Sequence, residues 1–319
     1  MIEQATPGGR DSLVEFTDVS KWYGPVIAVN DVTLSLTSGV TGFVGPNGAG
    51  KSTLFKLLTG QLRPSLGRVC IRGIDAWSAA AKSHVGYCPD VDAFYEEMSG
   101  RAFVQTISKL HGFSRQAARE RTEQVLEQVG MTDRAHRRIG SYSKGMRQRI
   151  KLAQALVHDP DLVVLDEPLN GVDPVGRREL VRLFRQLADD GKMVLISSHI
   201  LGEMDTLTDS VSFICRGRVL ASGSLEQIRD MLNDHPLHVR ITSDKTRQLA
   251  ARTIGLESVR GAELSDGNDL ILEVERPAEF FQSLGELVLQ EQFEIERMEV
   301  LDASTEAIFD YLMHNAMRP

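Results

Sequence analysis

The sequence predicts an α/β fold, in which a sheet core carries a helical insertion and is followed by a small α+β module. Short apolar runs of strand length alternate with helical segments, a block of three helical segments interrupts them, and a separate order of strands and helices begins after residue 236. With 319 residues and 42% hydrophobic content, the chain is long enough for one sizeable domain and a smaller one. We expect a disordered lead-in at 1–12, a core domain at 13–232 with a helical subdomain at about 92–158, and an accessory module at 237–319.

The core domain begins with three strand-like segments, the third of which runs directly into a glycine-rich turn. Apolar or alternating residues predict strands at 14–16, 32–36 and 40–44. A helix is expected at 52–58, and turn residues at 63–67 precede a strand at 68–71. A strand, a loop and a helix in this order are typical of the start of a nucleotide-binding α/β unit.

The middle of the chain changes to helical periodicity and then returns to strands. The helical subdomain is expected to contain helices at about 101–110, 114–129 and 143–157. Apolar runs then predict strands at 162–165, 193–196 and 211–215, separated by helices near 175–188 and 200–207. The insertion therefore divides the strands of one sheet into two groups along the sequence.

The accessory module follows a break in the helical pattern around residues 233–236. The predicted order is strand 237–242, helix 245–253, strand 257–264, a turn at 265–268, strand 270–275, helix 277–289 and strand 294–300. The order β-α-β-β-α-β indicates a ferredoxin-like module. A last helix is expected at 304–313, with Ser304 as its N-cap.

Composition excludes several classes of protein. The net charge is −8, and the segment from Leu237 onward holds 16 of the 44 acidic residues but only 8 of the 36 basic ones. Neither the main body nor this acidic segment has the strong basic excess of a nucleic-acid-binding protein, so no nucleic acid is expected as a partner, and a local basic patch is the alternative. The three cysteines are far apart, which indicates neither a disulfide framework nor a zinc site. No apolar run approaches the roughly 20 residues of a membrane-spanning helix, and the first residues do not resemble a secretory signal.

The glycine-rich turn at 45–52 fits the phosphate-loop pattern and lies between a predicted strand and a predicted helix. Its backbone N–H groups can wrap phosphates, Lys51 can reach the β and γ oxygens, and the Ser52 hydroxyl can bind magnesium. A glycine-rich turn that binds nothing is the alternative. The expected nucleotide-binding residues here are Gly45, Pro46, Asn47, Gly48, Ala49, Gly50, Lys51, Ser52 and Thr53.

Two adjacent carboxylates end the apolar strand at 162–165. Asp166 can hold magnesium, and Glu167 can polarise the water that attacks the γ-phosphate. Adjacent acids after a strand are also common as solvated strand ends. Their occurrence together with a phosphate loop favours the catalytic interpretation.

The segment that precedes these acids carries a resemblance to a known family. It reads Ser141-Tyr142-Ser143-Lys144-Gly145-Met146-Arg147-Gln148-Arg149 and resembles the signature segment of ABC transporter ATP-binding subunits. Tyr142, Lys144 and Met146 depart from the usual Leu-Ser-Gly-Gly-Gln, and this form is similar to that of the ABC-2-type exporter ATPases. Without its neighbours, Ser143 could equally be a plain helix N-cap.

The resemblance covers about residues 13–229 and implies an α/β phosphate-loop NTPase core of ABC type. It implies that Ser143 and Gly145 contact the γ-phosphate, that Tyr23 stacks on adenine, that Asp173 belongs to a dimer-contact loop, and that His199 senses the γ-phosphate. Packing roles are the alternatives for Tyr23 and His199.

Asp90 departs from the family pattern. The family has glutamine after a Tyr-x-Pro run, which in this chain is Tyr87-Cys88-Pro89. A carboxylate at this position is expected to lie on the metal side of the nucleotide, as a third magnesium-side residue beside Ser52 and Asp166. An aspartate that points into solvent is the alternative.

The resemblance also implies the activity, the cofactors and the partners. We expect an ATPase that uses ATP and Mg²⁺, with Lys51, Glu167 and His199 as catalytic residues, working as a homodimer or heterodimer of ATPase subunits. It would drive separate transmembrane permease subunits of an ABC-2-type exporter from the cytoplasmic face of the cell membrane. A soluble ABC ATPase acting on ribosomes or DNA is the first alternative, and another phosphate-loop enzyme, such as a small-molecule kinase, is the second.

Overall fold

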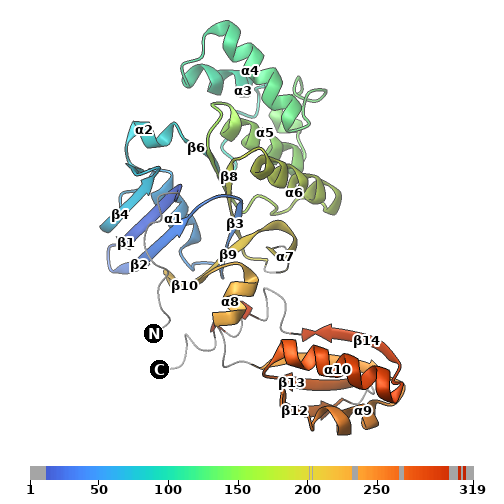
Figure 1. Ribbon diagram of the computed structural model, residues 1–319. Coiled ribbons are helices and arrows are strands. Elements are labelled where there is room, and N and C mark those ends of the chain that lie inside the picture. Colours follow the sequence, from blue (N-terminus) through green and yellow to red (C-terminus); the bar gives the residue numbers. More distant parts are fainter. Residues whose placement is uncertain are drawn as a thin grey trace. The chain divides into compact units, whose positions relative to one another are not determined.

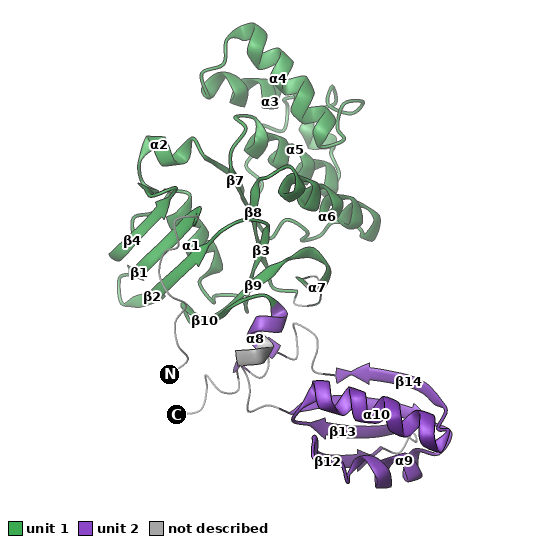
Figure 2. Cartoon of the chain, in the orientation of Figure 1, with its two compact units in different colours: residues 1–224 green, residues 225–319 purple. Residues whose placement is uncertain are grey.

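A computed structural model describes residues 12–200, 202, 204–231, 236–265, 269–301, 308–309 and 312–313. The chain forms two compact units, residues 1–224 and residues 225–319 (Figures 1 and 2). The expected lead-in falls outside the described residues except for Ser12, and so do most of the expected last helix with Ser304 and most of the turn at 265–268.

The first unit is built on a six-stranded sheet in the order β10-β9-β3-β8-β7-β6. Five of its strands are parallel, and β10 joins the edge antiparallel to β9. Every residue of β3, β7 and β8 is buried, as expected for parallel strands covered on both faces. The strands are β3 (Val40–Val44), β6 (Val85–Cys88), β7 (Leu162–Asp166), β8 (Met193–Ser198), β9 (Ser210–Cys215) and β10 (Arg218–Gly223).

A second, antiparallel sheet has the order β2-β1-β4-β5. Its inward side chains, such as Phe16 and Val69, share one buried apolar cluster with Phe55 of the helix that follows β3. This cluster fixes both ends of the phosphate loop, because the loop joins β3 to that helix and both elements contribute side chains to the cluster. The elements are β1 (Val14–Tyr23), β2 (Val26–Leu36), β4 (Leu66–Ile71), β5 (Ile74–Asp75), α1 (Lys51–Leu58) and α2 (Ala79–Lys82).

The helical insertion consists of α3 (Gly100–Leu110), α4 (Arg115–Gln128) and α5 (Lys144–Leu156), with a short 3-10 turn η1 (Ile139–Ser141) before α5. Each of the three long helices begins at a serine whose hydroxyl accepts a backbone N–H three residues later. Such N-caps satisfy amide groups that the first helical turn leaves unpaired. The unit is completed by α6 (Pro174–Asp189) and α7 (Met204–Leu207).

Strand β6 has no counterpart among the predicted strands. It is only four residues long and contains Gly86, so its apolar signal is weak. The glycine is required there, since a Cβ atom at Gly86 would lie 2.1 Å from the Ala155 carbonyl oxygen of α5. This close approach brings the residues after β6, including Asp90, next to the helix that begins at Ser143.

The second unit contains the predicted order of strands and helices. Its four-stranded sheet is antiparallel throughout, in the order β12-β13-β11-β14, and Phe280 of α10 and Leu249 of α9 belong to its buried core. The division between the units leaves α8 with the second one. The elements are α8 (Leu225–Met231), β11 (Leu237–Ser243), α9 (Thr246–Thr253), β12 (Val259–Leu264), β13 (Asp269–Val274), α10 (Pro277–Glu291) and β14 (Ile295–Val300).

No helix within the described ranges is both long and apolar enough to cross a membrane.

Candidate active site

The phosphate loop connects the buried strand β3 to helix α1, and its glycines meet specific steric demands. Gly48 and Gly50 have φ values of +81° and +109°, which favour a residue without a Cβ atom. A Cβ atom at Gly45 would lie 2.1 Å from the Ile214 carbonyl oxygen. The loop therefore depends on glycine for its shape. In this shape, the backbone N–H groups at the start of α1 form a site that can bind an anion.

Lys51 lies in this loop and is only 6% exposed. Its Nζ donates hydrogen bonds to the carbonyl oxygens of Gly45 at 2.6 Å and Pro46 at 3.3 Å, and it lies 3.8 Å from Glu167 Oε1. Burial lowers the pKa of Lys51, while the negative charges of Glu167 and Asp166 oppose that shift. The ammonium group is thus held inside the loop that would receive a phosphate chain.

Asp166, the last residue of β7, is buried, and its carboxylate accepts hydrogen bonds from residues of three other elements. Its Oδ1 accepts hydrogen bonds from Ser197 Oγ at 2.6 Å and from Ser52 Oγ at 3.3 Å, and its Oδ2 accepts one from the Tyr87 hydroxyl at 3.4 Å. Burial and the nearby Asp166 raise the pKa of Tyr87, so this phenol stays a neutral donor. Ser52 and Asp166 together present hard oxygen atoms, the ligands that Mg²⁺ prefers.

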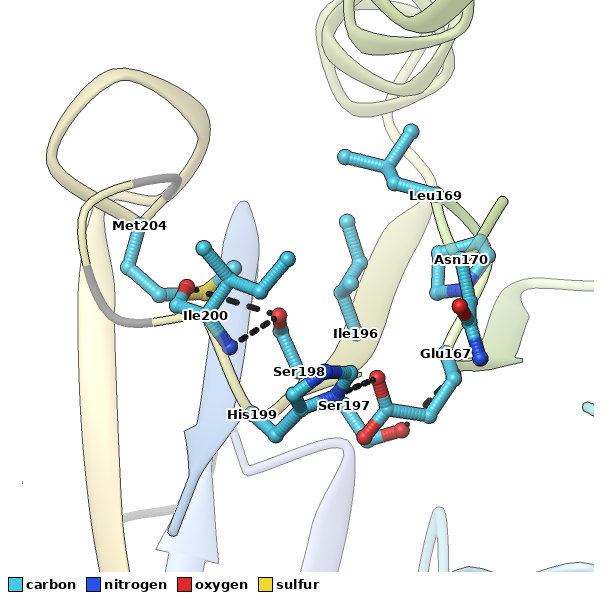
Figure 3. Close-up of a pocket in the computed structure, with 10 residues that line it drawn as sticks. Glu167, Leu169, Asn170, Ile196, Ser197, Ser198, His199, Ile200 and Met204 are labelled. Atoms are coloured by element: carbon cyan, nitrogen blue, oxygen red, sulfur yellow. Dashed lines mark hydrogen bonds and ion pairs between the residues drawn. The ribbon is translucent and has the colours of Figure 1, made fainter. Parts of the chain in front are cut away.

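Glu167 follows with a backbone φ of +48°, which is uncommon for a residue other than glycine and clusters at functional sites. Its N–H donates to Ser197 Oγ at 2.9 Å, and its Oε2 accepts from His199 Nδ1 at 2.8 Å. Figure 3 shows the Glu167 and His199 side chains directed toward each other. The carboxylate is 14% exposed and His199 39%, so the pair can be reached from solvent.

Ser197 is a site residue that the sequence analysis missed. Its hydroxyl accepts from Glu167 N–H and donates to Asp166 Oδ1, so it orients both carboxylate residues. The parallel pairing of β7 and β8 sets Ser197 opposite Asp166. A signal was available in the sequence, since Ser197 lies two positions before His199, near the end of the strand adjacent to the acidic pair.

Replacing Ser197 with alanine is expected to lower ATP turnover by about tenfold, because two buried polar groups lose their partner at a cost of about 1–3 kcal/mol. Steady-state ATPase assays test this. Ser212→Ala is the matched control, since Ser212 is a buried serine on strand β9 of the same sheet, and its hydroxyl pairs with Ser222 at 2.7 Å. Equal turnover in the Ser197→Ala and Ser212→Ala variants would contradict the orienting role.

The signature residues form a second group at the start of α5. Ser143 is exposed, and its Oγ accepts the Met146 N–H at 3.3 Å. Gly145 leaves space toward the next loop, where a Cβ atom would lie 3.6 Å from Val172 Cγ1. Asp173 ends that loop as the N-cap of α6, where hydrogen bonds from the N–H groups of Gly176 and Val175 lower its pKa. Ser143, Gly145 and Asp173 therefore belong to adjacent surface segments.

Two predicted site residues, Tyr23 and Asp90, lie outside these clusters. Tyr23, at the end of β1, is 46% exposed, with Lys21 Nζ 5.8 Å from its ring centroid. Asp90 is exposed, and its carboxylate has no hydrogen bond or ion pair to any other described residue. Its main-chain oxygen accepts from Lys151 Nζ at 3.0 Å. Both side chains are exposed, so a ligand could contact either of them from solvent.

The structure thus brings Lys51, Ser52, Asp166, Glu167 and His199 together at the carboxyl ends of β3, β7 and β8. Ligands of α/β folds bind at this edge of the sheet. A buried cation faces two carboxylates beside an anion-binding loop, and one carboxylate is held by a histidine. The arrangement suits the attack of water on a phosphoryl group.

Comparison with known proteins gives consistent matches. The family model described as ABC transporter matches residues 29–170. The daunorubicin/doxorubicin resistance ATP-binding protein DrrA of Streptomyces peucetius is 32% identical over 278 residues, which cover 86% of this chain and 84% of that protein. The Nod factor export ATP-binding protein I of Burkholderia orbicola (strain AU 1054) is 37% identical over 214 residues, 66% of this chain and 70% of that protein.

The similarity extends to solved structures. One described as the ATP binding subunit of an ABC transporter matches with a TM-score of 0.63 and 28% identity, over 69% of this chain and 93% of that chain. The match to DrrA is longer than the first unit alone can supply, so it includes part of the second unit.

Proposed function

The chain belongs to the ABC transporter family of ATP-hydrolysing subunits, and on that premise we propose that it powers export through separate membrane permease subunits. The observation that carries the proposal is the contact network of Lys51, Asp166, Glu167 and His199 beside the phosphate loop. The direction of transport rests on relatives whose names include an export protein and a drug-resistance protein.

The contacts support a role for each catalytic residue. Lys51 would hold the β and γ oxygens of ATP, and Ser52 and Asp166, whose oxygen atoms lie 3.3 Å apart, would hold Mg²⁺. That ion would neutralise charge on the phosphates when bound. Glu167 would orient the attacking water and take up its proton, while His199 keeps the Glu167 carboxylate in place and faces the γ-phosphate.

A complete site is proposed to need two ATPase subunits. Ser143 is exposed and its hydroxyl caps its own helix, so the first turn of α5 presents free backbone N–H groups to the outside. In a head-to-tail dimer, this turn would cover the γ-phosphate held by the partner's loop, with Asp173 at the subunit contact. Tyr23 would stack on the adenine. The two subunits could be identical or different chains.

The second unit is proposed to be a ferredoxin-like module. Its support is the strand order β12-β13-β11-β14 with antiparallel neighbours and a helix in each half. The ATPase would act at the inner face of the cell membrane, because its permease partners lie in that membrane.

Affinity purification of the tagged chain in mild detergent tests the proposed function. A multi-spanning membrane protein that co-purifies and stimulates ATP hydrolysis is the expected result. Co-purification of ribosomal proteins or DNA, with no membrane protein, would support a soluble ABC ATPase instead.

Asp90 is expected to act on the metal side of the nucleotide, because magnesium between a carboxylate and a polyanion removes their repulsion. Asp90→Asn should raise the magnesium concentration for half-maximal hydrolysis by severalfold, and Asp90→Gln should keep substantial activity. Magnesium titrations of ATPase activity measure both. Equal half-saturation and turnover in wild type and Asp90→Asn would reject the metal role.

A further inference from the structure

Helix α5 carries basic side chains that face the segment after β6. Ser143 caps the helix, and Arg147 and Lys151 follow at one-turn spacing. The facing segment, residues 89–96, begins with Pro89 and Asp90. The helix that presents the signature residues is therefore in contact with the loop where this chain departs from its family.

Lys151 makes the most buried of these contacts, with only 4% of its side chain exposed. Its Nζ donates to the carbonyl oxygens of Pro89 at 2.8 Å and Asp90 at 3.0 Å, and it lies 3.1 Å from Asp92 Oδ1. An ammonium group has three N–H donors, and the three acceptors match that number. A buried lysine is tolerated only when it is paired in this way.

Two further contacts join α5 to the same loop. Arg147 binds Glu96 with both terminal nitrogens, at 2.7 Å each, in the bidentate geometry that fixes orientation. Gln148 Nε2 donates to Cys88 Sγ at 3.4 Å, at the end of β6. A shift of the loop would therefore break contacts along two turns of the helix.

We propose that Lys151 is a positioning residue, which holds the main chain of Asp90 in register with the signature helix. This inference rests on the proposed function, in which Asp90 faces the subunit's own nucleotide and Ser143 faces the partner's. The Lys151 ammonium lies against the main chain of Asp90 and the carboxylate of Asp92.

The first test compares Lys151→Met with Lys192→Met. Lys192 is the matched control, since its Nζ also pairs with a carbonyl oxygen, of Pro160 at 2.9 Å, and a carboxylate, of Asp159 at 2.7 Å. We expect Lys151→Met to lower turnover about tenfold, with ATP affinity of the monomer unchanged, and Lys192→Met to stay within about twofold of wild type. Lys151→Arg, which keeps the charge, should restore most of the turnover.

A readout independent of hydrolysis is amide hydrogen exchange of residues 89–96, which should become faster in Lys151→Met and not in Lys192→Met. Unchanged exchange together with wild-type turnover would overturn the positioning role. Loss of monomer ATP binding with a lowered melting temperature would also overturn it, since the lysine would then be needed only for folding.

A second test uses an Asp90→Gln background. There, Lys151→Met should again lower turnover by about tenfold, because Lys151 binds main-chain oxygens that this substitution leaves in place. A loss of less than about threefold in this background would overturn the positioning role. Failure of the proposed function is distinguishable, because the wild-type chain would then bind no membrane partner, whereas failure of this inference leaves ATP hydrolysis and partner binding by the wild type unchanged.

Discussion

Glu167→Gln is expected to reduce ATP turnover by roughly 10²–10⁴-fold, the usual contribution of a positioned general base. Glutamine keeps the size of the side chain and can still pair with His199, but its amide cannot take a proton from water. The main-chain hydrogen bond from Glu167 N–H to Ser197 and the Lys51 contacts with the loop carbonyls do not involve the carboxylate. ATP should therefore bind with near-normal affinity.

Single-turnover ATPase assays and equilibrium binding of ATP measure these two effects separately. Glu123→Gln is a suitable control, because Glu123 is a partly exposed glutamate on α4 that pairs with Arg101 at 3.0 Å. The Glu167→Gln chain should also accumulate as a dimer with ATP and Mg²⁺, as seen by size-exclusion chromatography with light scattering. Wild-type turnover in this variant would show that another group activates the water.

Much of the core was predictable because its strands are continuous apolar runs that lead into residues with special roles. Residues 40–44 were predicted as a strand and are β3, and the acids after residue 165 indeed end a buried strand. Local sequence suffices in such cases, since a buried parallel strand needs apolar side chains on both faces. The serine cap of α5 was equally visible, because an N-cap is defined by its own first turn.

The features that were missed depend on partners distant in sequence. Strand β6 is recognisable only through its pairing with β7, and the role of Ser197 arises from its register opposite Asp166. Lys151 resembles an ordinary helix lysine until the carbonyl oxygens of Pro89 and Asp90 are placed around it. Periodicity gives the element in which a residue lies but not the atoms that its side chain meets.

Ser143→Arg is expected to abolish turnover while leaving ATP binding to the monomer intact, because the arginine would occupy the surface at which the partner's phosphates must approach. The substitution also removes an N-cap, which costs about 0.5–2 kcal/mol of helix stability. Ser114→Arg separates the two effects, since Ser114 caps α4 through the same type of hydrogen bond, from Ala117 N–H at 3.2 Å. It should lower the melting temperature to a similar extent and keep turnover near that of wild type.

The decisive comparison places Ser143→Arg in the Glu167→Gln background, where ATP should no longer produce a dimer. Mixing this double variant with a chain that has an intact Ser143 but carries Lys51→Ala tests the assignment further. In a head-to-tail dimer of these two chains, the intact Ser143 faces the intact phosphate loop of the double variant, so that one ATP site keeps both of its halves. Such a mixture should recover ATP-dependent association, whereas either chain alone should not. If Ser143→Arg instead abolishes ATP binding by the isolated monomer, Ser143 serves its own subunit's nucleotide and the head-to-tail arrangement is wrong.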